Sequence, residues 1–198
     1  ASGVQTFTNA GQTLTLNGAS VVNGNGVFGL SGRTLTGAGN LTVNGTFNWT
    51  GGTMSGSGAT FANGGLTMSG TTKELSGRTL VNTATATWSA GALNTGLGSV
   101  LSNAPSGTFD ISFDATEGNL GGARTIANAG LFRKTGGTGA AALSEVFNNT
   151  GTVEVQSGTL SLNGGGTSTG NFTNTVGGTL DFGGGTHTLS AASSVTNS

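Results

Sequence analysis

The sequence predicts an all-β chain wound as a parallel β-solenoid, a right-handed β-helix with three faces. Gly accounts for 40 of the 198 residues, and Gly, Thr, Asn and Ser, which are weak helix formers, dominate the chain. Short runs such as "TFNW", "TVEV" and "TLDF" alternate polar and apolar residues with the period of a strand. Such runs recur in a unit of about 21–27 residues, and the rule for parallel crossovers favours right-handed winding.

Pairs of similar segments establish the repeat. "SGRTL" occurs at residues 31–35 and again at 76–80, and "FNWTGGTMSG" resembles "ATWSAGALNT". Near the C-terminus, "GTVEVQSGTLSLNGGG" at 151–166 resembles "GTLDFGGGTHTLSAAS" at 178–193. Gly-, Asn- and Ser-containing segments between the strands supply the tight corners that such a coil needs. We therefore expect residues 1–198 to form one domain of about nine coils, with three short strands in each coil.

Each predicted strand holds an apolar residue between polar neighbours, so the period of two directs that residue inward and its neighbours outward. No second strand is recognisable in the sixth coil, between Phe113 and Leu120, and residues 138–143 supply that of the seventh. The predicted inward residues of the first strands are Phe7, Phe28, Phe47, Leu66, Ala86, Phe109, Phe132, Val153 and Leu180. Those of the second strands are Leu14, Leu35, Met54, Leu75, Leu93, Leu160 and His187. Those of the third strands are Val21, Leu41, Phe61, Leu80, Val100, Ile126, Val146, Phe172 and Val195.

Some first strands carry a second inward residue two positions further on. Trp49 and Trp88 are the largest of these, and we expect both indoles to point inward from equivalent strands, two coils apart. Lys134 occupies the same position in its own strand, so we expect that strand to end early or to shift. The other residues of this set are Ile111, Val155 and Phe182.

Composition excludes several classes of function. Charged residues make up 7% of the chain, the formal net charge is -1, and the 6 basic residues are scattered, which leaves no footprint for nucleic acid. No apolar run approaches the ~20 residues of a membrane-spanning helix. Without Cys and with a single His, the chain offers no zinc-finger spacing, and we expect no cofactor. His187 takes the position of Leu160 one coil earlier, and we interpret it as a neutral core histidine bonded to a hydroxyl or backbone group.

Carboxylates on the first face are the first candidates for chemistry. The outward residue of this face is predicted to run through Asp110, Arg133, Glu154 and Asp181 on successive coils. Glu154 and Asp181 would then lie about 5 Å apart, a spacing that suits Ca²⁺ binding or the carboxylate pair of a retaining glycosidase. A solvated ladder, in which Arg133 offsets part of the repulsion, explains the same residues without a site and is the preferred interpretation.

Outward threonines on the second face are the second candidate. A flat ladder of hydroxyl groups would suit an ice-binding or ligand-binding face, although Thr is also favoured at any exposed strand position. Glu74, Ala92 and Asn94 interrupt the ladder. Its predicted members are Thr13, Thr15, Thr34, Thr36, Thr53, Thr159, Thr186 and Thr188.

The repeats also resemble those of a known class of protein. "NAGLFRKTGGTG", "FNNTGTVEVQSGTLSLNGGGTSTGNF" and "GGTLDFGGGTHTLSAASSV" are similar to repeats of very large bacterial surface and secreted proteins, which include autotransporter passengers and filamentous-haemagglutinin-like adhesins. The resemblance is strongest over residues 125–198. It implies a right-handed β-helix, export from the cell, a role as a stalk, adhesin or biofilm matrix element, and no catalytic residue.

We therefore expect a non-enzymatic β-solenoid, extracellular or at the cell surface, whose partner is a host, carbohydrate or matrix surface. The alternatives are the protomer of a filament stacked end to end, an ice-binding solenoid and a polysaccharide-active β-helix enzyme. Neither "ASGVQTFTNAGQTLTLNG" nor "LSAASSVTNS" looks like a capping element. Because an open coil exposes unpaired backbone and core side chains, we expect either continuation beyond both ends or head-to-tail self-association.

Overall fold

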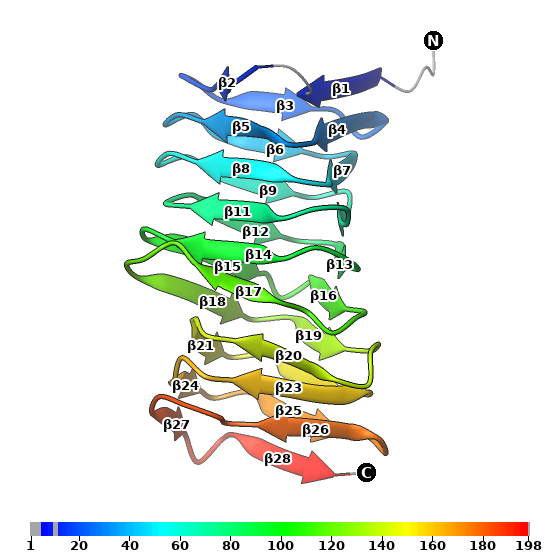
Figure 1. Ribbon diagram of the computed structural model, residues 1–198, viewed down its shortest axis with the longest axis vertical. Helices are drawn as coiled ribbons and strands as arrows, with labels where there is room; N and C mark the ends of the chain where they lie inside the picture. The colour runs from blue at the N-terminus through cyan, green and yellow to red at the C-terminus, as the bar shows by residue number, and fades with distance from the viewer. Residues whose placement is uncertain (1–4, 10–11, 198) are drawn as a thin grey trace.

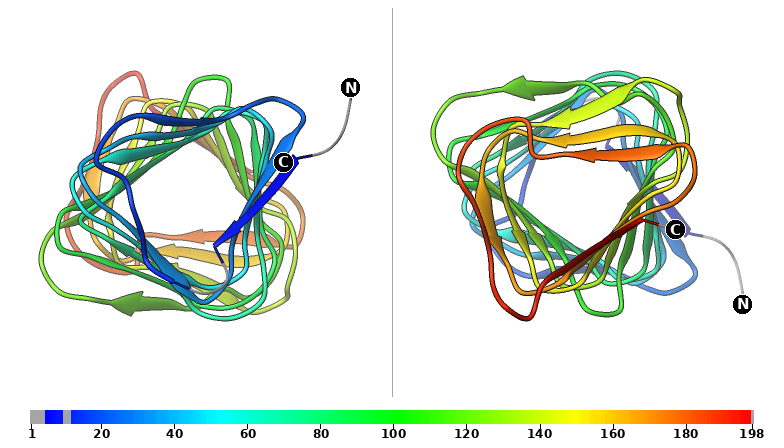
Figure 2. Two further views of the ribbon diagram at one scale, coloured as in Figure 1. Left: turned by 90° about the horizontal axis from the view of Figure 1, so that it is seen from above. Right: turned by 90° about the horizontal axis from the view of Figure 1, so that it is seen from below.

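The computed structural model describes residues 5–9 and 12–197, which form a parallel β-solenoid of about nine coils. Three faces enclose the core, paired strands run parallel, and no helix occurs among the described residues. Figure 1 shows the coils stacked along one axis from β1 to β28, and Figure 2 shows the faces surrounding that axis. The predicted fold class is confirmed.

The first face is a ten-stranded sheet and the third a nine-stranded sheet, whereas the second is divided between β17 and β20 into a six-stranded and a three-stranded sheet. The strands of the first face are β1 (Gln5–Asn9), β4 (Gly26–Leu30), β7 (Thr46–Trp49), β10 (Leu66–Met68), β13 (Thr85–Trp88), β16 (Thr108–Ile111), β19 (Leu131–Lys134), β22 (Thr152–Val155), β25 (Asn171–Asn174) and β28 (Ser194–Asn197). Those of the second face are β2 (Leu14–Thr15), β5 (Arg33–Thr36), β8 (Gly52–Ser55), β11 (Lys73–Ser76), β14 (Leu93–Gly96), β17 (Glu117–Asn119), β20 (Ala140–Leu143), β23 (Gly158–Leu162) and β26 (Gly178–Asp181). Those of the third face are β3 (Ser20–Val22), β6 (Leu41–Val43), β9 (Ala59–Ala62), β12 (Thr79–Asn82), β15 (Ser99–Asn103), β18 (Arg124–Asn128), β21 (Val146–Asn149), β24 (Gly166–Ser168) and β27 (His187–Leu189).

Glycine is required where one coil passes another at a corner. Gly52 has a φ of 86°, and a Cβ atom there would lie 2.2 Å from the carbonyl oxygen of Arg33 in the preceding coil. Gly91 has a φ of 72°, and a Cβ atom there would lie 2.2 Å from the carbonyl oxygen of Thr71. Both the backbone conformation and the close approach of the coils therefore exclude a side chain.

Apolar residues stack in register inside the first face. Phe28 pairs with Phe47, and Phe109 pairs with Phe132, each with ring centroids 5.1 Å apart. Tilted and stacked rings of this kind add to the free energy gained by burying apolar surface. The register of the first face confirms the predicted order of residues from Phe7 to Val153.

The last two coils differ from the prediction. Phe172 follows Val153 on the first face, and Val195 follows Phe172. Leu180 therefore lies on the second face, in β26, where it pairs with Leu160. The prediction missed β24 because its sequence, "GTS", contains no apolar residue to mark it as a strand. One missed strand moved every later assignment onto the wrong face.

On the third face, the predicted inward residues Leu41, Leu80 and Ile126 are confirmed, since all three are buried. Four other strands are displaced by one residue, because each contains two adjacent apolar residues and the period of two cannot decide between them. Val21, Phe61, Val100 and Val146 face outward, and their neighbours Val22, Ala62, Leu101 and Phe147 face the core.

On the second face, the prediction holds for four coils and then shifts. The prediction placed Leu93 next to Leu75, but Leu75 pairs with Thr95 and Leu93 pairs with Lys73. The predicted alignment is therefore displaced by two residues in this strand. The strand that could not be recognised in the sixth coil is β17, and β20 confirms the predicted strand of the seventh. The correctly aligned residues are Leu14, Leu35, Met54 and Leu75.

The two tryptophans lie as predicted. Trp49 and Trp88 point inward from β7 and β13, with Met68 of β10 between them, and neither is more than 1% exposed. The indole N–H of Trp49 donates to the carbonyl of Gly52, and that of Trp88 donates to the carbonyl of Gly91. Each indole is therefore hydrogen-bonded to the turn that follows its strand.

Lys134 continues the column of the tryptophans, between Ile111 and Val155, and is fully buried. Its strand neither ends early nor shifts, contrary to the prediction. The ammonium group reaches Asp114 at 3.2 Å and the carbonyls of the next corner, so an inward position is compatible with the charge.

A column of asparagines fills the corner between the third face and the first. Asn82, Asn103, Asn128 and Asn149 each end a strand and are at most 2% exposed. The Nδ2 atom of each donates to the Oδ1 atom of the next, at 2.9, 2.8 and 2.8 Å. Their second N–H groups donate to corner carbonyls, such as that of Leu131. Because an amide both donates and accepts, identical side chains satisfy one another along the axis.

We predict that Asn103→Ala lowers the free energy of unfolding by about 2–3 kcal/mol, because it removes the donor to the buried Oδ1 atom of Asn128 and an acceptor of the Asn82 amide. Urea denaturation measures the change. The matched control is Ser102→Ala, which alters the outward neighbour in the same strand and should change the stability by less than about 0.5 kcal/mol. Equal effects of the two substitutions would contradict a stabilising role for the column.

Candidate functional site

The predicted carboxylate pair is not formed. Asp110, Arg133 and Glu154 do lie on successive strands of the first face, and Arg133 contacts Asp110 at 3.2 Å. The next residue in the column is Thr173, because β25 follows β22. Asp181 lies on the second face and accepts a hydrogen bond from the Ser161 hydroxyl. The predicted pairing of Glu154 with Asp181, on which a candidate site for Ca²⁺ or glycoside hydrolysis depended, is therefore wrong.

The separated carboxylates have other partners. Glu154 accepts a hydrogen bond from the side-chain amide of Gln156, two residues further along the chain. Among the described residues, no group of three or more His, Cys, Asp or Glu side chains is arranged to hold a metal ion.

The threonine ladder is shorter than predicted. Thr15 pairs with Thr36, and Thr34 pairs with Thr53, on the second face. The hydroxyl of Thr53 is engaged, because it donates to Glu74 at 2.8 Å.

The later members of the predicted ladder do not continue that column. Thr13 precedes β2, and Thr159 lies on β23, in the separate three-stranded sheet. Thr186 precedes β27, and Thr188 lies within β27 on the third face, where it pairs with Thr167. The ladder therefore does not resume at Thr186 and Thr188, for the same reason that Asp181 is displaced.

His187 lies in β27 and not opposite Leu160. Its Nε2 atom lies 3.1 Å from the carbonyl oxygen of Leu162 and 3.0 Å from that of Gly184. The ring packs on Phe182, with centroids 4.8 Å apart. The predicted face is wrong, but the half-buried ring does bond to backbone groups, as the interpretation of a structural histidine requires.

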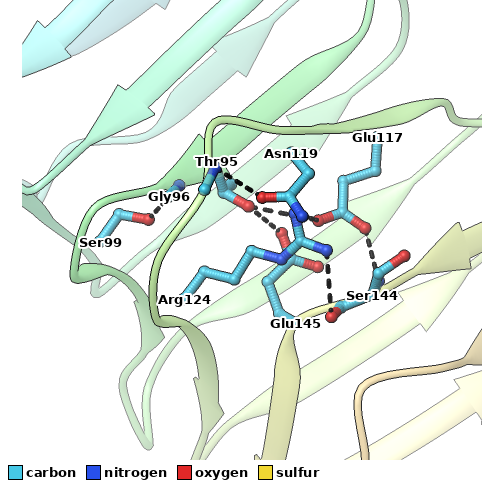
Figure 3. Close-up of polar contacts among 9 residues, drawn as sticks. Thr95, Gly96, Ser99, Glu117, Asn119, Arg124, Ser144 and Glu145 are labelled. Atoms are coloured by element: carbon cyan, nitrogen blue, oxygen red, sulfur yellow. Dashed lines mark hydrogen bonds and ion pairs between the residues drawn. The ribbon is translucent and has the colours of Figure 1, made fainter.

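A cluster of polar side chains that sequence reasoning missed lies where the second face is divided. Thr95 of β14, Glu117 of β17, Arg124 of β18 and Glu145 in the corner before β21 converge there, as Figure 3 shows. Thr95 and Glu145 are each 2% exposed. The Thr95 hydroxyl lies 2.6 Å from one carboxyl oxygen of Glu145 and 3.2 Å from one of Glu117.

The two carboxyl groups of the cluster have different electrostatic surroundings. Glu117 accepts a hydrogen bond from the backbone N–H of Ser144, and Arg124 lies 3.9 Å away from it. Burial raises the pKa of Glu145 to about 8, and the neighbouring carboxyl group of Glu117 adds to this effect. At neutral pH, the arrangement therefore favours the protonated form of Glu145.

Two buried cations are bonded to backbone carbonyls at other corners. The Lys73 ammonium donates to the carbonyls of Ser69, Thr71 and Ala90, at 2.8 to 2.9 Å, and burial lowers its pKa to about 8. The guanidinium of Arg78 bonds to the two preceding coils and so links three successive coils. Its five hydrogen bonds go to the Thr60 hydroxyl and to the carbonyls of Gly37, Gly39, Ser55 and Ala59.

A signal for these buried charges was present in the sequence. Lys73 and Arg78 each stand two residues before a core residue, Leu75 and Leu80, so the period of two places them inward. Glu145 likewise stands two residues before Phe147. It was not recognised as inward, because Val146 was predicted as the inward residue of that strand. A charged residue that stands two positions before a core residue therefore indicates a buried charge, and such positions can be found from the sequence.

Comparisons with known proteins add no closer description of the chain. No family model, curated protein or solved structure matches it. Within the described part of the chain, no helix is both long and apolar enough to cross a membrane. The fold and the buried polar groups are therefore the basis for any proposal about function.

We predict that Arg78→Met lowers the free energy of unfolding by at least about 3 kcal/mol, because it removes the donors of five acceptors in a buried corner. Arg133→Met is the control, since a partly exposed ion pair contributes less than about 1 kcal/mol. Guanidinium denaturation of both variants measures the difference. Similar losses of stability would contradict the proposed clamping of three coils by Arg78.

Proposed function

We propose that this chain is a non-enzymatic structural rod, extracellular or at the cell surface, that serves as a stalk, adhesin or matrix element. The observation that carries the proposal is the ten-stranded first face, whose inner residues stack coil upon coil along the whole rod. Ten strands at the usual spacing give a length of about 43 Å. Backbone hydrogen bonds between coils run along this axis and resist extension of the rod. This property suits a stalk that holds other domains or surfaces apart.

The outer surface supports an adhesive role. Adjacent strands of the first face present Thr67 beside Thr87 outward, and Thr173 beside Thr196. The charged column from Asp110 to Glu154 separates these two pairs of hydroxyl groups. With only 7% charged residues, the chain has little electrostatic repulsion to keep it from a neutral surface. The resemblance of the repeats to bacterial surface proteins favours a host, carbohydrate or matrix surface as the partner.

We predict that the chain is retained on one or more surfaces of a panel of polysaccharides and matrix proteins, and that it releases no reducing sugar from the polysaccharides. The Glu145→Gln and Glu154→Gln variants should behave in the same way. Turnover that either variant abolishes would assign an enzyme. The absence of retention on every surface would contradict the adhesive role.

A second observation favours self-association end to end. Val195 of β28 and Leu189 of β27 belong to the last coil, and they are 52% and 38% exposed. A further coil stacked on this end would bury them and pair the free edges of the two strands. We propose that a second copy of the chain supplies that coil and that the copies form a filament.

Sedimentation velocity tests the filament. Association of the unaltered chain should increase with concentration, and Val195→Lys should abolish it, because a charge would be buried at the joint. Val146→Lys is the matched control, since Val146 is 41% exposed and faces outward from β21, away from the last coil, and should leave the association unchanged. A chain that remains monomeric at high concentration, or an equal effect of the two substitutions, would contradict the filament.

A further inference from the structure

The second face has a gap in its backbone pairing. The six-stranded sheet ends at β17, and the three-stranded sheet begins at β20, so no strand pairing joins these two elements of the described chain. On the first and third faces, strand pairing continues past the same level, from β16 to β19 and from β18 to β21. The contacts that cross the gap on the second face are made by side chains.

Glu117 and Glu145 make the contacts at one end of the gap. Glu117 accepts a hydrogen bond from the backbone N–H of Ser144, which follows β20, and its carboxyl group faces that of Glu145 (Figure 3). At the other end, Asp114 accepts from the backbone N–H of Gly139 and contacts Lys134. Residues 112–123, which contain β17, are therefore attached to the following coil at two points.

The hydrogen-bond partners of the two glutamates favour a proton between them. The Thr95 hydroxyl has one hydrogen, yet it lies within hydrogen-bond distance of a carboxyl oxygen from each of them, at 2.6 and 3.2 Å. The second carboxyl oxygen of Glu145 is buried and has no protein donor. Two ionised groups would leave these oxygens unsatisfied, whereas one added proton supplies the donor that is needed.

Counting charges gives the same result. The groups that face the pair are Thr95 from β14, Arg124 from β18 and the backbone N–H of Ser144. Arg124 is the one cation that contacts the pair in the described structure, and it lies 3.9 Å from Glu117. It balances one carboxylate, and the buried second carboxyl group is neutral only if it keeps its proton.

From this geometry we infer that Glu117 and Glu145 form a proton-binding site that holds residues 112–123 to the following coil. Protonated, the pair shares a hydrogen bond across the gap. Deprotonated, it places two like charges in a buried position with a single cation, and the strand β17 separates from the coil that follows. The site is a latch that is closed at acidic and neutral pH and opens at alkaline pH.

The sign of the pH dependence follows from the two protonation states. The pKa of Glu145 rises from 4.5 to about 8 in the folded chain, mainly through burial. Between these values the unfolded chain releases the proton and the folded chain keeps it, so the free energy of unfolding falls as pH rises. Lys73, whose pKa is lowered to about 8, has the opposite effect from there up to 10.5, and a comparison of variants that all retain Lys73 cancels it.

The test is the pH dependence of urea unfolding between pH 5 and 9 for the unaltered chain and for Glu145→Gln. The unfolding equilibrium constant of the unaltered chain, relative to that of the variant, should rise by more than about tenfold over this range, because glutamine stays neutral and keeps a donor. Glu154→Gln, on the outer surface of the first face, is the matched control and should keep the full pH dependence. Equal pH dependence of the unaltered chain and Glu145→Gln would overturn the inference.

A second measurement needs no variant. Carbon-13 NMR of the glutamate carboxyl groups should show one group that titrates near pH 8, and hydrogen exchange of residues 112–123, corrected for its intrinsic pH dependence, should accelerate above that pH. Titration of Glu145 below about pH 5 would contradict the site. Exchange that is unchanged in this segment while Glu145 titrates would contradict the latch.

Discussion

Axial matching is the constraint on which the rest of the structure depends. Parallel strands in register place each inward residue directly above and below a residue from the neighbouring coils, at the spacing of a β-sheet. An apolar residue meets this condition with any apolar neighbour, as Phe28, Phe47 and Leu66 do. An inward polar residue meets it only if the next coil, or the corner beside it, supplies a donor or acceptor.

The three corners of the coil meet this condition in different ways. At the corner between the third and first faces, asparagines pair with identical asparagines. Between the first and second faces, Lys73 and Lys134 donate to the carbonyls that the glycine-rich turns expose. Between the second and third faces, Arg78 bonds to carbonyls from several coils, and Glu145 shares a proton with Glu117. Each solution pairs a buried polar group with backbone or side-chain groups of its own or a neighbouring coil.

The sequence predicted the fold class and the first face because both depend on a simple period. Alternation placed Phe47 and Trp49 correctly, since each is an isolated apolar residue between polar ones. It failed where two apolar residues are adjacent, as at Val146 and Phe147, and where a strand has none, as in β24. The proposed pairing of Glu154 with Asp181 failed through that missed strand.

The polar cluster was harder to predict than the fold. Whether a carboxyl group is buried depends on which coil covers it, and Glu145 is buried at the level where β17 and β20 do not pair. The strand at this gap, β17, ends the segment "DISFDATEGN", in which no strand of the second face could be recognised from the sequence. A repeat predicts what its copies share, and sites of this kind arise where one copy departs from the rest.

Amide hydrogen exchange, measured strand by strand at neutral pH, tests axial matching most directly. The account predicts the slowest exchange in β12 and β15, which pair on both sides and end in the asparagine column, and clearly faster exchange in β17, which pairs on one side only. Uniform protection along the rod, or protection of β17 equal to that of β15, would contradict the claim that matched inward columns hold the coils together.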